Sequence, residues 1–288
     1  MHFLSIFTAS QILWILTFAA LLVLLVVLLG RDRVKRFPVF TTSIVLMALL
    51  LLTAELVLNR LQRITGTEIY LALSGLDAIV SLMVVFELAR RAFRGASRLA
   101  WSIAVSVALA LAATVLYFWG AWPAWKTLTA SSQLAVIQWM ELVSDKVTLL
   151  AGLLAIELGV LVVAFGRSFH AGWRSHVQQI VIGLSTVSLA QFAINMTLRT
   201  IGLHTRVQTQ ADYERLIGLR DKFIHANNAV YICALVWWIV WLWLDEPDAA
   251  KAADSEQKPE VASASEDRGA EPAVESALKS DKKQSTEN

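Results

Sequence analysis

Residues 12–29 read ILWILTFAALLVLLVVLL and contain no charged side chain, whereas residues 31–36 read RDRVKR. An uncharged apolar segment of this length spans the hydrocarbon core of a bilayer when it is helical. No basic region precedes it and no small-residue cleavage site follows it, so it does not have the form of a removable signal peptide. The segment therefore predicts a transmembrane helix that ends at a basic loop.

Six more apolar segments of similar length follow along the chain. With the first, the predicted spans are residues 10–30, 39–58, 69–89, 99–119, 146–165, 177–198 and 228–245. Their apolar residues are continuous, whereas the strands of a membrane barrel are shorter and alternate. The chain is 57% hydrophobic and 17% charged, while soluble domains carry about 25% charge. We therefore expect an all-α fold, a seven-helix transmembrane bundle over residues 1–245.

The short loops between the predicted spans differ in their content of lysine and arginine. The loops after the first, third and fifth spans are basic and hold Arg31, Arg33, Lys35, Arg36, Arg90, Arg91, Arg94, Arg98, Arg167 and Arg174. The short loops on the other side hold Arg60, Arg63 and Lys126. Because basic loops stay in the cytoplasm, we expect a multi-pass protein of the bacterial inner membrane with its N-terminus outside and its C-terminus inside. Loop 199–227 is also basic, but long loops weigh less.

Residues 246–288 form a segment of different composition, with 11 acidic and 6 basic residues and no aromatic residue. Such a segment cannot bury enough apolar surface to offset the entropy lost on ordering. We expect a disordered acidic cytoplasmic tail whose removal leaves the stability of the bundle unchanged. Residues 131–145 and 212–226 have a helical pattern outside the predicted spans. The second segment is interpreted either as an extension of the seventh span or as a lid over an outer opening.

Polar side chains inside the predicted spans are candidates for function, because a charge in the bilayer core is costly and usually faces the bundle interior. Glu157 lies near the middle of the fifth span, and Lys146, eleven residues earlier, points the same way. Asp77 lies in the third span. Its helical spacing puts it on one polar face with Tyr70, Ser74 and Ser81.

Two further polar stripes lie in other spans: Gln191, Asn195 and Arg199 in the sixth, and Glu55 and Asn59 in the second. In the predicted orientation Glu157 lies near mid-depth, and seven other polar residues lie in the outer half: Glu55, Asn59, Asp77, Gln191, Asn195, Lys146 and Asn228. The pattern predicts one polar cavity open to the outside, whose ligand-binding residues are Glu157, Asp77, Gln191, Asn195, Glu55 and Lys146. The alternative is a set of separate hydrogen bonds that hold the helices together.

Several known membrane chemistries are excluded by missing residues. A retinal protein needs a lysine in its last helix, and residues 228–245 contain none. The five histidines lie in loops or at the ends of predicted spans: His2, His170, His176, His204 and His225. This placement argues against a haem or zinc site, and neither a phosphate-binding loop nor a serine-hydrolase elbow occurs. We therefore expect no metal, no cofactor and no enzymatic activity.

Two junctions between spans and basic loops carry a resemblance. The sequences Glu87-Leu88-Ala89-Arg90-Arg91-Ala92-Phe93 and Gly166-Arg167-Ser168-Phe169 resemble those of an uncharacterised group of bacterial seven-helix integral membrane proteins. The resemblance covers residues 10–245 in layout. It implies the seven-helix fold and the inner-membrane location, and it carries over no catalytic or ligand-binding residue.

The expected function is that of a non-enzymatic heptahelical sensor or accessory protein, which binds a small polar ligand or an envelope partner from outside. The alternatives are a small-solute transporter, which would need a polar lining in both halves of the bundle, and a structural membrane protein. The lipid bilayer is the expected partner. Nucleic acid is not, because the basic residues lie in short loops and form no stripe.

Overall fold

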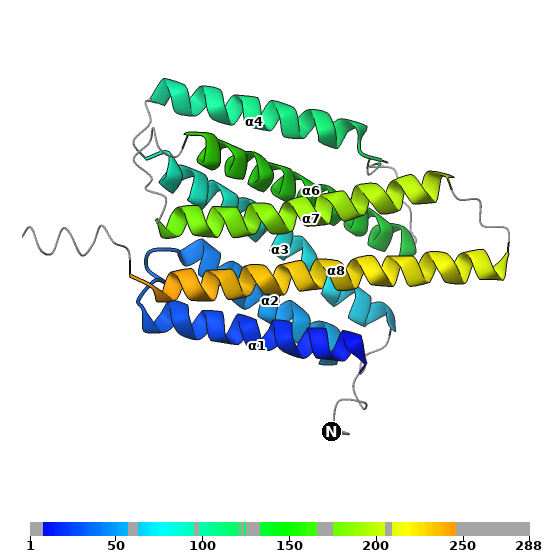
Figure 1. Cartoon of the computed structure of the whole chain (residues 1–288). Coiled ribbons are helices and arrows are strands. Elements are labelled where there is room, and N and C mark those ends of the chain that lie inside the picture. Colours follow the sequence, from blue (N-terminus) through cyan, green and yellow to red (C-terminus); the bar gives the residue numbers. More distant parts are fainter. Residues whose placement is uncertain are drawn as a thin grey trace, which may run out of the picture. The chain divides into compact units, whose positions relative to one another are not determined.

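The computed structural model describes residues 8–56, 63–94, 98–120, 122, 124, 133–165, 175–204 and 209–245. These residues form seven α-helices (Figure 1). The helices are α1 (Ala9–Gly30), α2 (Pro38–Leu56), α3 (Arg63–Ala92), α4 (Arg98–Phe118), α6 (Gln133–Phe165), α7 (His176–His204) and α8 (Gln210–Trp243). The expected acidic tail, residues 246–288, lies outside the described residues.

Six of these helices are long and apolar enough to cross a membrane, and α2 has a shorter apolar stretch, Pro38–Ala54. Large apolar side chains such as Val26, Phe86 and Val160 are more than half exposed on the outside of the bundle. A soluble protein rarely exposes apolar surface on this scale. The all-helical architecture predicted from the sequence is confirmed, and the six apolar helices suggest a multi-pass membrane protein.

The fifth and seventh helices are longer than the predicted spans. α6 begins at Gln133 and α8 at Gln210, so residues 133–145 and 212–226, which have a helical pattern in the sequence, are continuous with the spans that follow them. Thr209 caps α8: its hydroxyl accepts a hydrogen bond from the Asp212 amide at 3.2 Å, while the Asp212 carboxylate accepts one from the Thr209 amide at 3.1 Å. The interpretation of residues 212–226 as an extension of the last span is confirmed, because α8 is one continuous helix.

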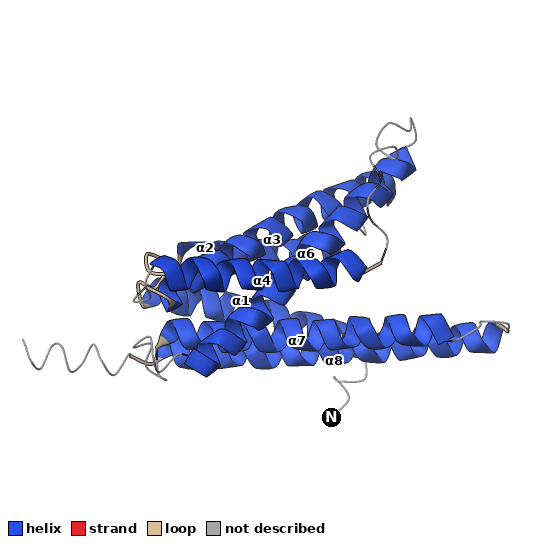
Figure 2. Cartoon of the chain, turned by 90° about the horizontal axis from the view of Figure 1, so that it is seen from above, coloured by secondary structure: helices blue, strands red, loops and turns tan. Residues whose placement is uncertain are grey.

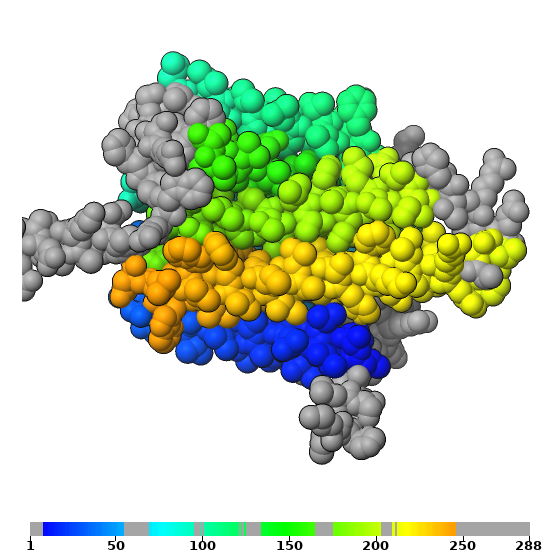
Figure 3. All heavy atoms as spheres, viewed as in Figure 1, coloured from blue at the N-terminus to red at the C-terminus, as the bar shows by residue number. Residues whose placement is uncertain are grey.

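Six of the helices pack as a closed ring. α1, α2, α3, α6, α7 and α8 each contact the next, and α8 returns to contact α1. Among the described helices α4 packs only on α6, outside this ring. Figures 1 and 3 both show α4 at the edge of the bundle.

Small residues set the spacing within the ring. Gly159 of α6 lies directly against Ser185 of α7, whose hydroxyl donates to the carbonyls of Ala155 at 2.6 Å and Val181 at 2.7 Å. Gly183 of α7 lies directly against the indole of Trp238 on α8. Glycine and serine allow close approach of helices in a membrane, where packing and hydrogen bonds rather than the hydrophobic effect drive association.

Candidate functional site

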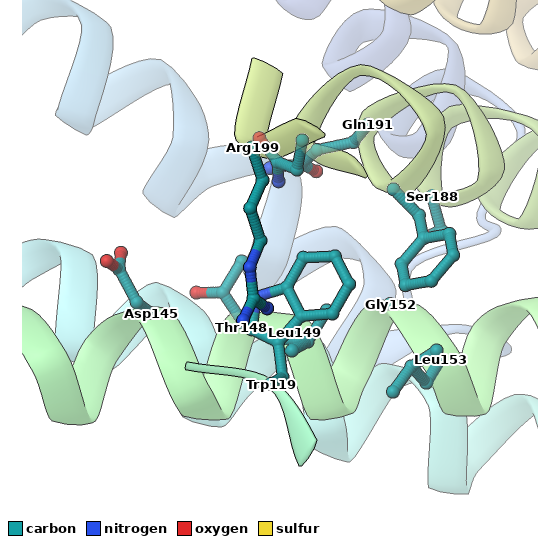
Figure 4. Close-up of a pocket in the computed structure, with 11 residues that line it drawn as sticks. Trp119, Asp145, Thr148, Leu149, Gly152, Leu153, Ser188, Gln191 and Arg199 are labelled. Carbon is teal, nitrogen blue, oxygen red and sulfur yellow. The ribbon is translucent and has the colours of Figure 1, made fainter. Parts of the chain in front are cut away.

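A polar pocket of about 330 Å³ lies between α6 and α7, beside the end of α4 (Figure 4). Figure 2 shows α3 and α6 diverging from α7 and α8 toward the end at which α8 begins, and the pocket lies at this end. Its polar lining consists of Asp145, Thr148, Ser188, Gln191, Asn195 and Arg199.

The lining follows from helical spacing on two antiparallel helices. Ser188, Gln191 and Asn195 recur at intervals of three and four residues, which places them on one face of α7. Asp145 and Thr148 share a face of α6 in the same way. The hydrogen bond from Ser185 to the Ala155 carbonyl fixes the register between the two helices, so the two polar faces meet.

Arg199 is held across the pocket by aromatic rings. Its guanidinium lies 5.2 Å from the centroid of Trp119, and Trp119 in turn lies 5.2 Å from the ring of Phe192. Figure 4 shows the Arg199 side chain reaching from α7 toward α6. Asp145 lines the same pocket, and within the described part of the chain no ion pair joins Asp145 to Arg199. A cation and a carboxylate are therefore both available to a bound solute.

The structure brings some predicted site residues together at this pocket and leaves others elsewhere. Gln191, Asn195 and Arg199 line it, as their common stripe predicted. Asn59 and the side chain of Glu55 lie outside the described residues. Asn228 is half-buried on α8 and does not line the pocket.

Lys146 is buried, and its side chain binds the C-terminal end of α4. Its ammonium group donates to the carbonyls of Leu116, at 3.3 Å, and Trp119, and lies 4.7 Å from the centroid of Trp122. The last carbonyls of a helix have no partner within the helix and carry the negative end of its dipole. Lys146 therefore holds the end of α4 rather than lining the pocket.

Asp77 and Glu157 do not line the pocket and lie at different depths. The hydroxyls of Ser74 on α3 and Ser144 on α6 are 3.2 Å apart, and the two helices run in the same direction (Figure 1). Asp77 is three residues beyond Ser74, whereas Glu157 is thirteen beyond Ser144. At 1.5 Å per residue, Glu157 lies about 15 Å further along the bundle. The structure does not place the two carboxyl groups in one cavity.

A second group of buried polar side chains lies near the opposite end of the bundle. His176, Gln178 and Gln179 at the start of α7 are all at most 5% exposed. Within the described residues, one oxygen of Gln178 and one of Glu157 are buried without a hydrogen-bond partner. None of these three α7 residues is among the candidates predicted from the sequence, although Gln178 and Gln179 are adjacent polar residues within the predicted sixth span.

The described residues contain no group of three or more His, Cys, Asp or Glu side chains that could hold a metal ion. No protein-family model, no curated protein and no solved structure matches the chain. The function of the chain is therefore inferred from the pocket and from the arrangement of the helices, and its resemblance to the seven-helix group stays a prediction.

Proposed function

We propose that the chain is a seven-span protein of the bacterial inner membrane, with its N-terminus outside and its C-terminus in the cytoplasm. The basic loops support this orientation. The length of α2 supports a count of seven membrane-spanning helices. Its 19 residues extend about 28 Å, close to the roughly 30 Å of a bilayer core. Trp14 near the start of α1 donates to the Leu51 carbonyl near the end of α2, so the two helices run antiparallel.

Single-cysteine labelling in intact cells tests this topology, after replacement of Cys233, the natural cysteine. Cysteines at Thr65 and Gln208 are expected to react with a membrane-impermeant maleimide, and cysteines at Lys35 and Gly95 only after permeabilisation. A cysteine at Ser263 that reacts from outside would contradict the proposal, because it requires an even number of spans.

The proposed function is binding of a small polar solute from the outside, in a non-enzymatic sensor or accessory protein. The observation that carries this proposal is the pocket, in which the Arg199 guanidinium lies over the Trp119 ring and forms no ion pair with a carboxylate of the described residues. A fixed guanidinium binds a carboxylate or phosphate through charge-assisted hydrogen bonds. Gln191 and Asn195 offer further hydrogen-bond donors and acceptors. The Asp145 carboxylate can pair with the ammonium group of a zwitterionic solute.

We expect Arg199→Gln to weaken binding of an acidic or zwitterionic solute by about tenfold to a hundredfold, because a hydrogen bond to a charged group contributes about 1.5–3 kcal/mol. Acetate, glycine and glutamate are suitable probes, with binding measured by isothermal titration calorimetry on protein in nanodiscs. Arg220→Gln is the matched control, since Arg220 is exposed on α8. Equal losses in both variants, or no binding of any probe to the parent, would contradict the proposal.

The buried polar group around Gln178 favours transport as the second candidate. A transporter needs polar side chains in both halves of the bundle, and His176, Gln178 and Gln179 supply them in the half away from the pocket. Proteoliposomes distinguish the two functions. A sensor binds the probe without accumulating it inside the vesicle, whereas a transporter accumulates it when a gradient is imposed.

A further inference from the structure

A second pocket, of about 680 Å³, lies at the other end of the bundle from the polar pocket. Arg90 and Arg94 from the end of α3 line it, together with the apolar side chains of Met83, Phe86 and Trp101. The pocket therefore combines basic groups with apolar surface at the end of the membrane-spanning helices, where lipid headgroups lie.

An apolar groove of about 240 Å³ adjoins this pocket. Phe86, Phe93 and Trp101 line both, and the groove continues along α3, α4 and α6 to Leu82 and Ala108. Although α3 and α4 are consecutive, their backbones stay apart among the described residues, and the contact at this junction is between the rings of Phe93, just after α3, and Trp101 of α4, whose centroids are 5.5 Å apart. The groove lies between these two helices, and its lining is almost entirely apolar.

The side chains of the two arginines at the mouth of the pocket have no partner among the residues that the structure describes. The side chains of Arg90, in the last turn of α3, and Arg94, four residues later, are exposed, and within the described residues no side-chain hydrogen bond or ion pair involves either guanidinium. The nearby carboxylate of Glu87 is already occupied. It accepts hydrogen bonds from Arg91 at 3.0 Å and from the Phe40 amide at 3.2 Å. Two positive charges therefore remain for an anion from outside the chain.

We propose that this pocket and groove bind one anionic phospholipid from the surrounding leaflet. Its phosphate lies between Arg90 and Arg94, and one acyl chain lies in the groove between α3 and α4. Basic pockets between membrane-spanning helices bind anionic headgroups in this way. The continuous apolar groove distinguishes a lipid from a free phosphate, which has no chain to place there. The site is independent of the solute pocket at the other end.

Native mass spectrometry of the full chain, titrated with phosphatidylglycerol, tests the headgroup contact. Arg90→Gln/Arg94→Gln is expected to weaken lipid binding about 25-fold, because each arginine near an anionic lipid contributes about fivefold. Arg215→Gln/Arg220→Gln removes the same charge from exposed positions on α8 and is expected to change binding less than twofold. Equal losses in the two double variants would overturn the proposal, as would equal affinity of the parent for phosphatidylcholine.

A second pair of variants tests the groove. Ala108→Phe fills it and is expected to weaken phosphatidylglycerol binding about tenfold, the effect of about two buried methylene groups. Ala110→Phe is the control, because Ala110 is exposed on α4 and does not line the groove. Glycerol 3-phosphate is expected not to displace the lipid. Two results would overturn the proposal: displacement of phosphatidylglycerol by glycerol 3-phosphate at a similar concentration, or equal phosphatidylglycerol binding by the two α4 variants. Either would show a site that binds the anion without an acyl chain in the groove.

Discussion

Gly183→Ala is expected to destabilise the bundle by about 2 kcal/mol. A methyl group at this position overlaps the indole of Trp238. That indole cannot move freely, because Trp238 is 2% exposed and packs edge-on against Phe40, with ring centroids 5.3 Å apart. Overpacking a tight interface forces side chains out of their preferred rotamers. The measurement is the free energy of unfolding in mixed micelles.

Gly75→Ala is the matched control for this prediction. A methyl group at Gly75 meets no atom within 4 Å, and alanine favours a helix over glycine by about 1 kcal/mol. This variant is therefore expected to be as stable as the parent or more stable. Trp238→Phe replaces the indole, whose Nε1 comes nearest to the new methyl group, by a smaller ring and is expected to rescue part of the loss in Gly183→Ala. Similar stability of the two alanine variants would contradict the close packing of α7 on α8.

Lys146→Met is expected to destabilise the protein by about 3 kcal/mol. The substitution leaves the carbonyls of Leu116 and Trp119 without the ammonium group that now binds them and removes the contact with the Trp122 ring. The Leu116 carbonyl keeps its hydrogen bond from the Trp119 amide at 3.3 Å, so the Trp119 carbonyl is the acceptor that loses its partner, and a buried acceptor left unpaired costs about 1–3 kcal/mol. Because α4 packs on α6 alone among the described helices, amide hydrogen exchange is expected to rise at the end of α4 more than elsewhere.

The control for Lys146 is Lys222→Met, since Lys222 is exposed on α8 and its charge is expected to contribute little to stability. Unfolding and hydrogen exchange of this variant should match those of the parent. Unchanged exchange at residues 110–118 in Lys146→Met would contradict the role assigned to Lys146, even if the overall stability fell.

The helices could be predicted from the sequence because the backbone of a continuous apolar segment must satisfy its own hydrogen bonds in a membrane, and a helix does so within the segment. The interpretation of Lys146 as a ligand-binding residue rested on its charge within an apolar segment. Its partners are backbone carbonyls 27 and 30 residues away, and no side-chain pattern reveals them. Only the part of the pocket that lies on a single helix could be predicted, because helical spacing relates residues of one helix. Gln191 and Asn195 of α7 are such residues.

To predict contacts between residues on different helices, one must know how far each helix is shifted along its neighbour. The sequence pattern of a single helix does not give this shift. Asp77 and Glu157 each lie well inside an apolar helix, so both were assigned to one cavity. The 3.2 Å contact between Ser74 and Ser144 fixes the relative depth of α3 and α6 and separates the two carboxyl groups. Asp145 was noted only as part of a helical segment before the fifth span, and its place in the pocket follows from the same register.

The closed ring of six helices has a consequence for biogenesis. Helices enter the membrane in the order of their synthesis, and α1, the first made of the described helices, packs against α8, the last. The ring therefore stays open until the final helix is inserted, and the polar faces of α3, α6 and α7 must be held until then by lipid, water or the insertion machinery. α4 enters before α6, its partner among the described helices, so it must remain stable in lipid alone while the chain is extended.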